Sequence, residues 1–139
     1  MEQPVFESVR YSTVCQDCGA ELECCGVQAL VAGRLRWDVE STCVVCGFAV
    51  ALCGGDLPSE QREQMLAEHG RVRLRVVSPS TKRVEIMRVL RVELGTDLVD
   101  AKALVRRVLS GDYCGTLPEM ELLARRLRAS GIAAVAERV

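Results

Sequence analysis

The segment Cys15-Gln16-Asp17-Cys18-Gly19 is matched further along the chain by Cys43-Val44-Val45-Cys46-Gly47, with 24 residues between the inner cysteines. Two residues between cysteines let one tight turn direct both thiolates at a single ion. The glycine that ends each segment tolerates the positive φ that such a turn often needs. Four thiolates form the closed tetrahedral shell of a structural zinc. We therefore predict one structural Zn²⁺ per chain, bound by Cys15, Cys18, Cys43 and Cys46.

The interval between the two cysteine pairs is slightly longer than the roughly 15–20 residues usual for such sites, and it leaves room for a hairpin between the two turns. The alternatives to zinc are two disulfides or four buried thiols without a metal. A closed site of four sulfurs leaves no position for substrate, so the predicted metal stabilises the fold and performs no chemistry.

Composition indicates the compartment and a division into two halves. The 139 residues include no apolar run that could span a bilayer, and the start Met1-Glu2-Gln3-Pro4 is no signal peptide, so we expect a cytoplasmic protein with reduced cysteines. Sixteen arginines against two lysines are typical of a GC-rich bacterial genome. Residues 1–70 carry a net charge of −7 and residues 71–139 a net charge of +6, which predicts two units with different partners, or two units that attract each other.

The first half reads as strands around the cysteine turns. We predict a strand over 5–11, the arms of a hairpin over 21–31 and 34–42, and a strand over 48–53. With the two Cys-x-x-Cys-Gly turns, residues 1–55 resemble a zinc ribbon. A unit this small buries too little apolar surface to be stable without its metal. Residues 56–70 are then predicted to form a helical connector that starts near Pro58 and ends at Gly70.

The sequence pattern of the second half, residues 71–139, predicts an α+β domain. Arginines alternate with apolar residues over 71–77, as in a half-buried strand, and Ser78-Pro79-Ser80 breaks that strand. Helices that end at Gly95 and Gly111 follow, with Leu94 and Leu98 in their apolar stripes, and Asp97 caps the second. A short strand near Tyr113, a helix started by a capping box and a strand over 132–139 complete the order β-α-α-β-α-β.

One stretch of the second half carries a family resemblance. Residues 82–91, with Gly95, Leu98 and the run Asp100-Ala101-Lys102, resemble the C-terminal domain of the bacterial ribosomal stalk protein without a gap. The resemblance implies the stalk fold over 71–139 and a basic helical face that binds translational GTPases. The residues at the family's basic positions are Arg83, Arg88, Arg91 and Lys102.

The chain also departs from the stalk family. Thr96-Asp97-Leu98 alters the turn between the first two helices, and residues 109–115 replace a segment rich in Pro, Lys and Gly. A zinc ribbon stands where the stalk protein has its dimerisation region. The chain is therefore predicted to be a different protein that contains the domain. The alternative is that these four basic residues form only a solvent-exposed helix face and bind no partner.

Other residues give little support to catalysis. His69, the only histidine, falls at the predicted C-terminus of a helix, where it interacts favourably with the dipole, and no glycine-rich phosphate loop precedes a helix, so we expect no enzyme. Cys24 and Cys25 are neighbours whose side chains point to opposite faces of a strand. They are predicted to be core or surface thiols, the alternative being a redox or second metal site with Cys53, and Cys114 is predicted to be a lone thiol.

Three functional hypotheses follow. The leading one is a zinc-binding adaptor or regulator whose basic helical face binds a protein, such as a translation factor, the ribosome or another large machine. The second is a nucleic-acid-binding regulator that uses the arginines of the second half, because the ribbon is acidic and its Trp37 is predicted to be core. The third is docking of the acidic half on the basic half, within one chain or between two.

Overall fold

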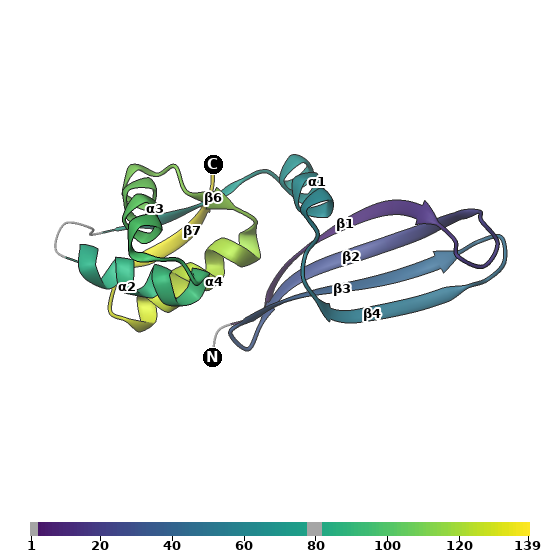
Figure 1. Ribbon diagram of the computed structural model, residues 1–139, viewed down its shortest axis with the longest axis horizontal. Helices are drawn as coiled ribbons and strands as arrows, with labels where there is room; N and C mark the ends of the chain where they lie inside the picture. Colours follow the sequence, from purple (N-terminus) through teal and green to yellow (C-terminus); the bar gives the residue numbers. More distant parts are fainter. Residues whose placement is uncertain (1–2, 78–81) are drawn as a thin grey trace. The chain divides into compact units, whose positions relative to one another are not determined.

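The computed structural model describes residues 3–77 and 82–139 (Figure 1). The predicted break at Ser78-Pro79-Ser80 lies outside the described residues. The chain divides into two compact units, Met1–His69 and Gly70–Val139. Both contain an antiparallel sheet, and the described residues form four helices, so the α+β class is confirmed.

The first unit is a four-stranded meander in the order β1-β2-β3-β4. All neighbouring strands pair antiparallel. Ala32 (φ 52°) and Gly33 (φ 77°) form the turn between β2 and β3, as the sequence predicts, with the positive φ at both positions that a two-residue hairpin favours. Because the chain runs up and down, the β1–β2 and β3–β4 turns share one end of the sheet. The strands are β1 (Val5–Val14), β2 (Glu21–Val31), β3 (Arg34–Cys43) and β4 (Ala49–Gly55).

Helix α1 (Ser59–His69) belongs to the first unit and packs on its sheet. Met65 is fully buried and packs in one cluster with Val9 and Trp37. The segment expected to connect the two units is therefore part of the first core, because burial of a large apolar side chain stabilises its docking.

Trp37 lies over a glycine of the neighbouring strand. It is 6% exposed, as expected for a core residue, and a Cβ atom on Gly26 would overlap its six-membered ring. A glycine within a strand marks a site of close approach, and here the indole occupies the space of the missing side chain. Gly26 therefore determines how deeply Trp37 is buried.

The second unit has the predicted element order, and its caps follow the sequence. Gly95 ends α2 in the left-handed conformation (φ 61°), and Asp97 Oδ1 accepts a hydrogen bond from the main-chain N–H of Asp100 at 2.8 Å. Thr116 and Glu119 form a reciprocal capping box. No helix among the described residues is long and apolar enough to cross a membrane. The elements are β5 (Val72–Val76), α2 (Arg83–Leu94), α3 (Leu98–Ser110), β6 (Cys114–Gly115), α4 (Leu117–Ala129) and β7 (Ala134–Arg138).

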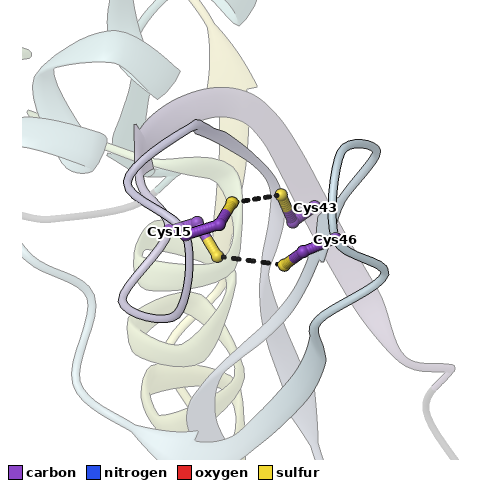
Figure 2. Close-up of side chains that lie close together, drawn as sticks. Cys15, Cys43 and Cys46 are labelled. Atoms are coloured by element: carbon purple, nitrogen blue, oxygen red, sulfur yellow. Dashed lines mark hydrogen bonds between the residues drawn. The ribbon is translucent and has the colours of Figure 1, made fainter.

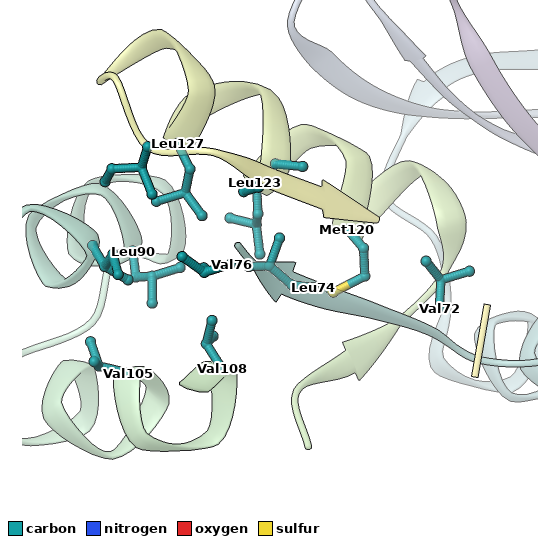
Figure 3. Packing of buried hydrophobic residues seen from close by; sticks show 13 residues of the cluster. Val72, Leu74, Val76, Leu90, Val105, Val108, Met120, Leu123 and Leu127 are labelled. Carbon is teal, nitrogen blue, oxygen red and sulfur yellow. The ribbon is translucent and has the colours of Figure 1, made fainter. Parts of the chain in front are cut away.

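The core of the second unit lies between the β6-β5-β7 sheet and the three helices. Figure 3 shows Val72, Leu74 and Val76 of β5 pointing into this core, among side chains of α2, α3 and α4. Leu94 and Leu98, which helical spacing places in the core, are instead 39% and 44% exposed. Leu94 is the last residue of α2 and Leu98 is the first of α3, so both lie at the ends of the apolar faces of these helices.

We predict that Gly26→Ala destabilises the first unit by about 1–3 kcal/mol, because the new methyl group displaces the Trp37 ring. Urea unfolding of the zinc-loaded protein measures the change. Gly55→Ala is the matched control, since its Cβ would lie 3.8 Å from the Trp37 carbonyl oxygen, an ordinary contact. Equal effects of the two substitutions would contradict the role given to the Gly26–Trp37 approach.

Candidate functional site

The two cysteine turns have the same local geometry. In the first, the N–H of Gly19 donates to Cys15 O at 2.9 Å and the N–H of Cys15 donates to Ala20 O at 2.7 Å. In the second, Gly47 and Cys43 form the equivalent bonds at 2.9 and 2.8 Å. Gly19 and Gly47 have φ of 77° and 79°, which favours glycine at both positions. The repeated Cys-x-x-Cys-Gly sequence therefore folds into a repeated turn at one end of the sheet.

The turns bring the four thiols into one cluster. All four Sγ atoms lie within 4.8 Å of one another. The Cys15 and Cys46 sulfurs are 3.7 Å apart and those of Cys18 and Cys43 are 3.6 Å apart, and Figure 2 shows the side chains converging from the two turns. Sulfurs at the corners of a tetrahedral zinc shell with bonds of ~2.3 Å lie about 3.8 Å apart. The cluster therefore has the donors and spacing to hold one metal ion.

The thiols of the cluster influence one another's ionisation, and their pKa values move in opposite directions. The main-chain N–H of Cys46, joined by that of Val45 and by the Cys18 thiol, outweighs burial and lowers the pKa of Cys43 to about 7. At Cys46 the N–H of Phe48 favours the thiolate, but burial and the neighbouring sulfurs outweigh it and raise the pKa to about 12. One thiolate thus opposes the ionisation of the next, and a divalent cation is what allows all four to ionise together.

The remaining cysteines lie apart from this cluster. Cys24 is buried, and Ser41 Oγ donates a hydrogen bond to its Sγ at 3.2 Å, whereas Cys25 is half-buried on the other face of β2. Cys53 is exposed on β4 and Cys114 lies in the second unit. Among the described residues the only metal-ligating group is the four-cysteine cluster, so none of these thiols joins a second one.

The predicted basic residues of the second unit border two hollows on α2 and α3. A hollow of about 240 Å³ is lined by Arg83, Lys102 and Arg106 together with apolar side chains. A second hollow of about 560 Å³ is lined by Arg88 and Arg91 and by further apolar side chains. Both hollows share Val84 and Met87, so the four predicted residues surround one apolar centre. We call this region the helical surface; it comprises Arg83, Val84, Met87, Arg88, Arg91, Val92, Lys102 and Arg106.

The helical surface is apolar in the middle and basic around it. Val84 is 62% exposed and Val92 is 77% exposed, although both are large apolar side chains. Within the described part of the chain, none of its basic side chains takes part in an ion pair. Sequence reasoning missed Val84 and Met87 as site residues, and it counted Arg106 only among the arginines available to nucleic acid. The signal for Val84 and Met87 is the spacing of three, four and seven residues from Val84 to Met87, Arg88 and Arg91, which places these side chains on one face of a helix.

Arg73, Arg75 and Arg107 line neither of the two hollows. Arg73 and Arg75 lie on the face of β5 opposite the core, where both bind Glu137, at 2.7 and 3.0 Å. The hydrogen bond from Arg73, followed by the charges of both arginines, lowers the pKa of Glu137 despite its partial desolvation. The Arg107 guanidinium lies 5.2 Å from the centre of the Tyr113 ring. The positive charge of this unit is therefore divided between opposite faces.

Comparison with known proteins gives no relative. No family model matches the chain, and neither a curated protein nor a solved structure is detectably similar to it.

We predict that Cys46→Ser abolishes stoichiometric metal binding, because three thiolates do not complete the closed shell. Cys53→Ser is the matched control, since Cys53 is equally an exposed cysteine of the first unit but lies outside the cluster. The measurement is the metal content after dialysis against a competing chelator, with thiolate-to-metal absorption of the cobalt-substituted protein as a second signal. Loss of metal from both variants, or from neither, would contradict the assignment.

Proposed function

We propose that this protein is a non-enzymatic, cytoplasmic adaptor or regulator that holds one structural Zn²⁺ and binds another protein through the helical surface. The partner is a translational GTPase, the ribosome or another large machine with an acidic and apolar binding site. Cys15, Cys18, Cys43 and Cys46 are the zinc ligands in this proposal, and Arg83, Arg88, Arg91 and Lys102 contact the partner.

The choice of zinc is supported by the donor set. Four thiolates in a tetrahedral arrangement are a preferred ligand set of Zn²⁺, and harder ions such as Mg²⁺ and Ca²⁺ favour oxygen ligands. The sulfur separations of 3.6 and 3.7 Å agree with that shell. In the zinc-bound protein the metal would link the β1–β2 turn to the β3–β4 turn and stabilise the sheet.

The observation that carries the binding proposal is the exposed apolar centre with its basic border. Solvent exposure of Val84 and Val92 costs free energy that a partner would recover on covering them. The surrounding arginines and lysine attract acidic partners and determine orientation more than they add affinity. An acidic, amphipathic helix fits this combination, because one face covers the valines and its edges meet the basic side chains.

The stalk resemblance points to the same residues. Within the second unit, the order β5-α2-α3-β6-α4-β7 agrees with the order expected for the stalk domain. The ungapped match around Arg88, Arg91 and Lys102 falls on the helical surface. These agreements support a stalk-type fold for residues 71–139 and a partner from translation.

Nucleic acid is the second candidate, because the basic side chains of the helical surface are exposed and without ion pairs in the described part of the chain. Phosphate contacts would use those charges and leave the exposed valines uncovered. The separation of Arg73 and Arg75 onto the opposite face also reduces the positive area available to a duplex.

We expect the zinc-loaded protein to capture its partner from a lysate of its own host in the presence of nuclease. Arg88/Arg91/Lys102→Glu should abolish this capture, because it turns the basic border acidic. Arg10/Arg34/Arg71→Glu is the matched control, with the same change in net charge at exposed positions outside the surface. Capture that disappears with nuclease would assign the function to nucleic acid, and capture that survives the first triple variant would refute the surface.

The double substitution Val84/Val92→Ser distinguishes protein binding from nucleic-acid binding by the helical surface. Protein binding should weaken at least about tenfold, because burial of two valines is worth a few kcal/mol, whereas phosphate binding should not change. Val99→Ser is the control, since Val99 is 74% exposed on α3 but lines neither hollow. Titration of each variant with the captured partner measures the dissociation constant, and equal constants for all three proteins would contradict an apolar contact.

A further inference from the structure

The two edge strands of the first sheet, β1 and β4, differ in whether other parts of the first unit cover their main chain. At the β1 edge, Gln64 Nε2 of α1 donates a hydrogen bond to the carbonyl oxygen of Arg10 at 2.7 Å. His69 Nε2 donates to the carbonyl oxygen of Ser8, also at 2.7 Å. Two main-chain acceptors of the edge are thus occupied by side chains of the helix beside it (Figure 1). Natural sheets use such covers to prevent another chain from adding a strand.

Among the described residues of the first unit, nothing covers the β4 edge in this way. All seven residues of β4, from Ala49 to Gly55, are exposed, and the strand lies at the free end of the β1-β2-β3-β4 order (Figure 1). Its sequence, Ala-Val-Ala-Leu-Cys-Gly-Gly, contains no charged residue and no proline. Charge and proline are the usual devices that block edge pairing, so β4 has the character of a strand that accepts a partner.

The ladder indicates which main-chain groups face outward. The N–H of Cys43 donates to Phe48 O at 2.8 Å, so this pair is hydrogen-bonded across the β3–β4 turn. Hydrogen-bonded and non-hydrogen-bonded pairs alternate in an antiparallel ladder, and Ser41 pairs with Val50 and Glu40 with Ala51. Val50 therefore directs its N–H and C=O toward β3. The N–H and C=O groups of Ala49 and Ala51 face away from the sheet.

We propose that β4 pairs antiparallel with β4 of a second copy of this chain, centred on Ala51, so that two four-stranded sheets join into one. In this register Ala51 faces Ala51 of the second copy in a hydrogen-bonded pair. Val50 faces Leu52 of the second copy, and this contact occurs twice because of the two-fold symmetry.

Charge and apolar surface favour a second copy as the occupant. Self-pairing about a two-fold axis brings identical residues together, and a charge near the centre of the strand would repel its mate. β4 has none. Leu52 is 64% exposed and lines a hollow of about 520 Å³ on the sheet, together with Phe48 and Val50. Pairing of the two strands would make the hollows of both copies continuous and cover part of their apolar lining.

The test places a charge at the centre of the strand. Ala51 is exposed and lies opposite Glu40 of β3, so in a single copy a lysine there can pair with Glu40, whereas a glutamate there is repelled by it. Sedimentation of the zinc-loaded full chain over a concentration series should give twice the 15.2 kDa mass of one chain. Ala51→Lys and Ala51→Glu should each weaken the dimer by about two- to fivefold, because like charges then lie opposite each other in one cross-strand pair. An equimolar mixture of the two variants should restore it, since opposite charges then pair.

Ser12→Lys is the matched control, because it adds the same charge to an exposed position on the covered β1 edge. It should leave the dimer unchanged. Zinc content and thermal melting of each variant exclude unfolding as the cause of dissociation. The proposal is overturned if the wild-type chain is a monomer at every concentration, if Ala51→Lys dimerises as well as wild type, or if the mixture of charged variants stays monomeric. Capture of a different protein by a monomeric chain would assign the edge to that partner and equally overturn it.

Discussion

The first unit depends on one constraint, namely that four sulfur atoms from two separate turns meet within one small volume. Cys15 and Cys43 each begin a turn and are buried, whereas Cys18 and Cys46 complete the group at the surface. The up-and-down path of the strands places both turns at the same end of the sheet. A metal ion at this point would link residues far apart in the chain, which a domain with so small a core requires.

Much of the fold could be predicted from local signals. Glycines with positive φ, the Asp97 cap and the Thr116 capping box are short-range features that the sequence displays directly, and the structure forms them where expected. The four cysteines were also predictable, because two Cys-x-x-Cys-Gly segments produce the same turn wherever the chain brings them together.

The docking of elements was harder to predict. Helix α1 is largely polar, and Met65 is its one fully buried residue, so its packing on the sheet leaves a weak sequence signal. The combination of Lys102 and Arg106 with Arg83 around one hollow depends on how α3 packs against α2, which neither helix shows alone. Leu94 and Leu98 continue the apolar stripes in the sequence. Whether their side chains are buried depends on how far the neighbouring elements extend, which the sequence of one helix does not show.

The placement of Trp37 has a practical consequence for optical spectroscopy. It is the only tryptophan of the chain, and it lies in the core of the metal-binding unit. Of the four helices in the described part of the chain, three belong to the other unit. Indole fluorescence therefore reports on one unit, and the far-ultraviolet helical signal reports mainly on the other. Recording both during a single chelator titration would reveal whether the two halves of the chain lose their structure together or in sequence.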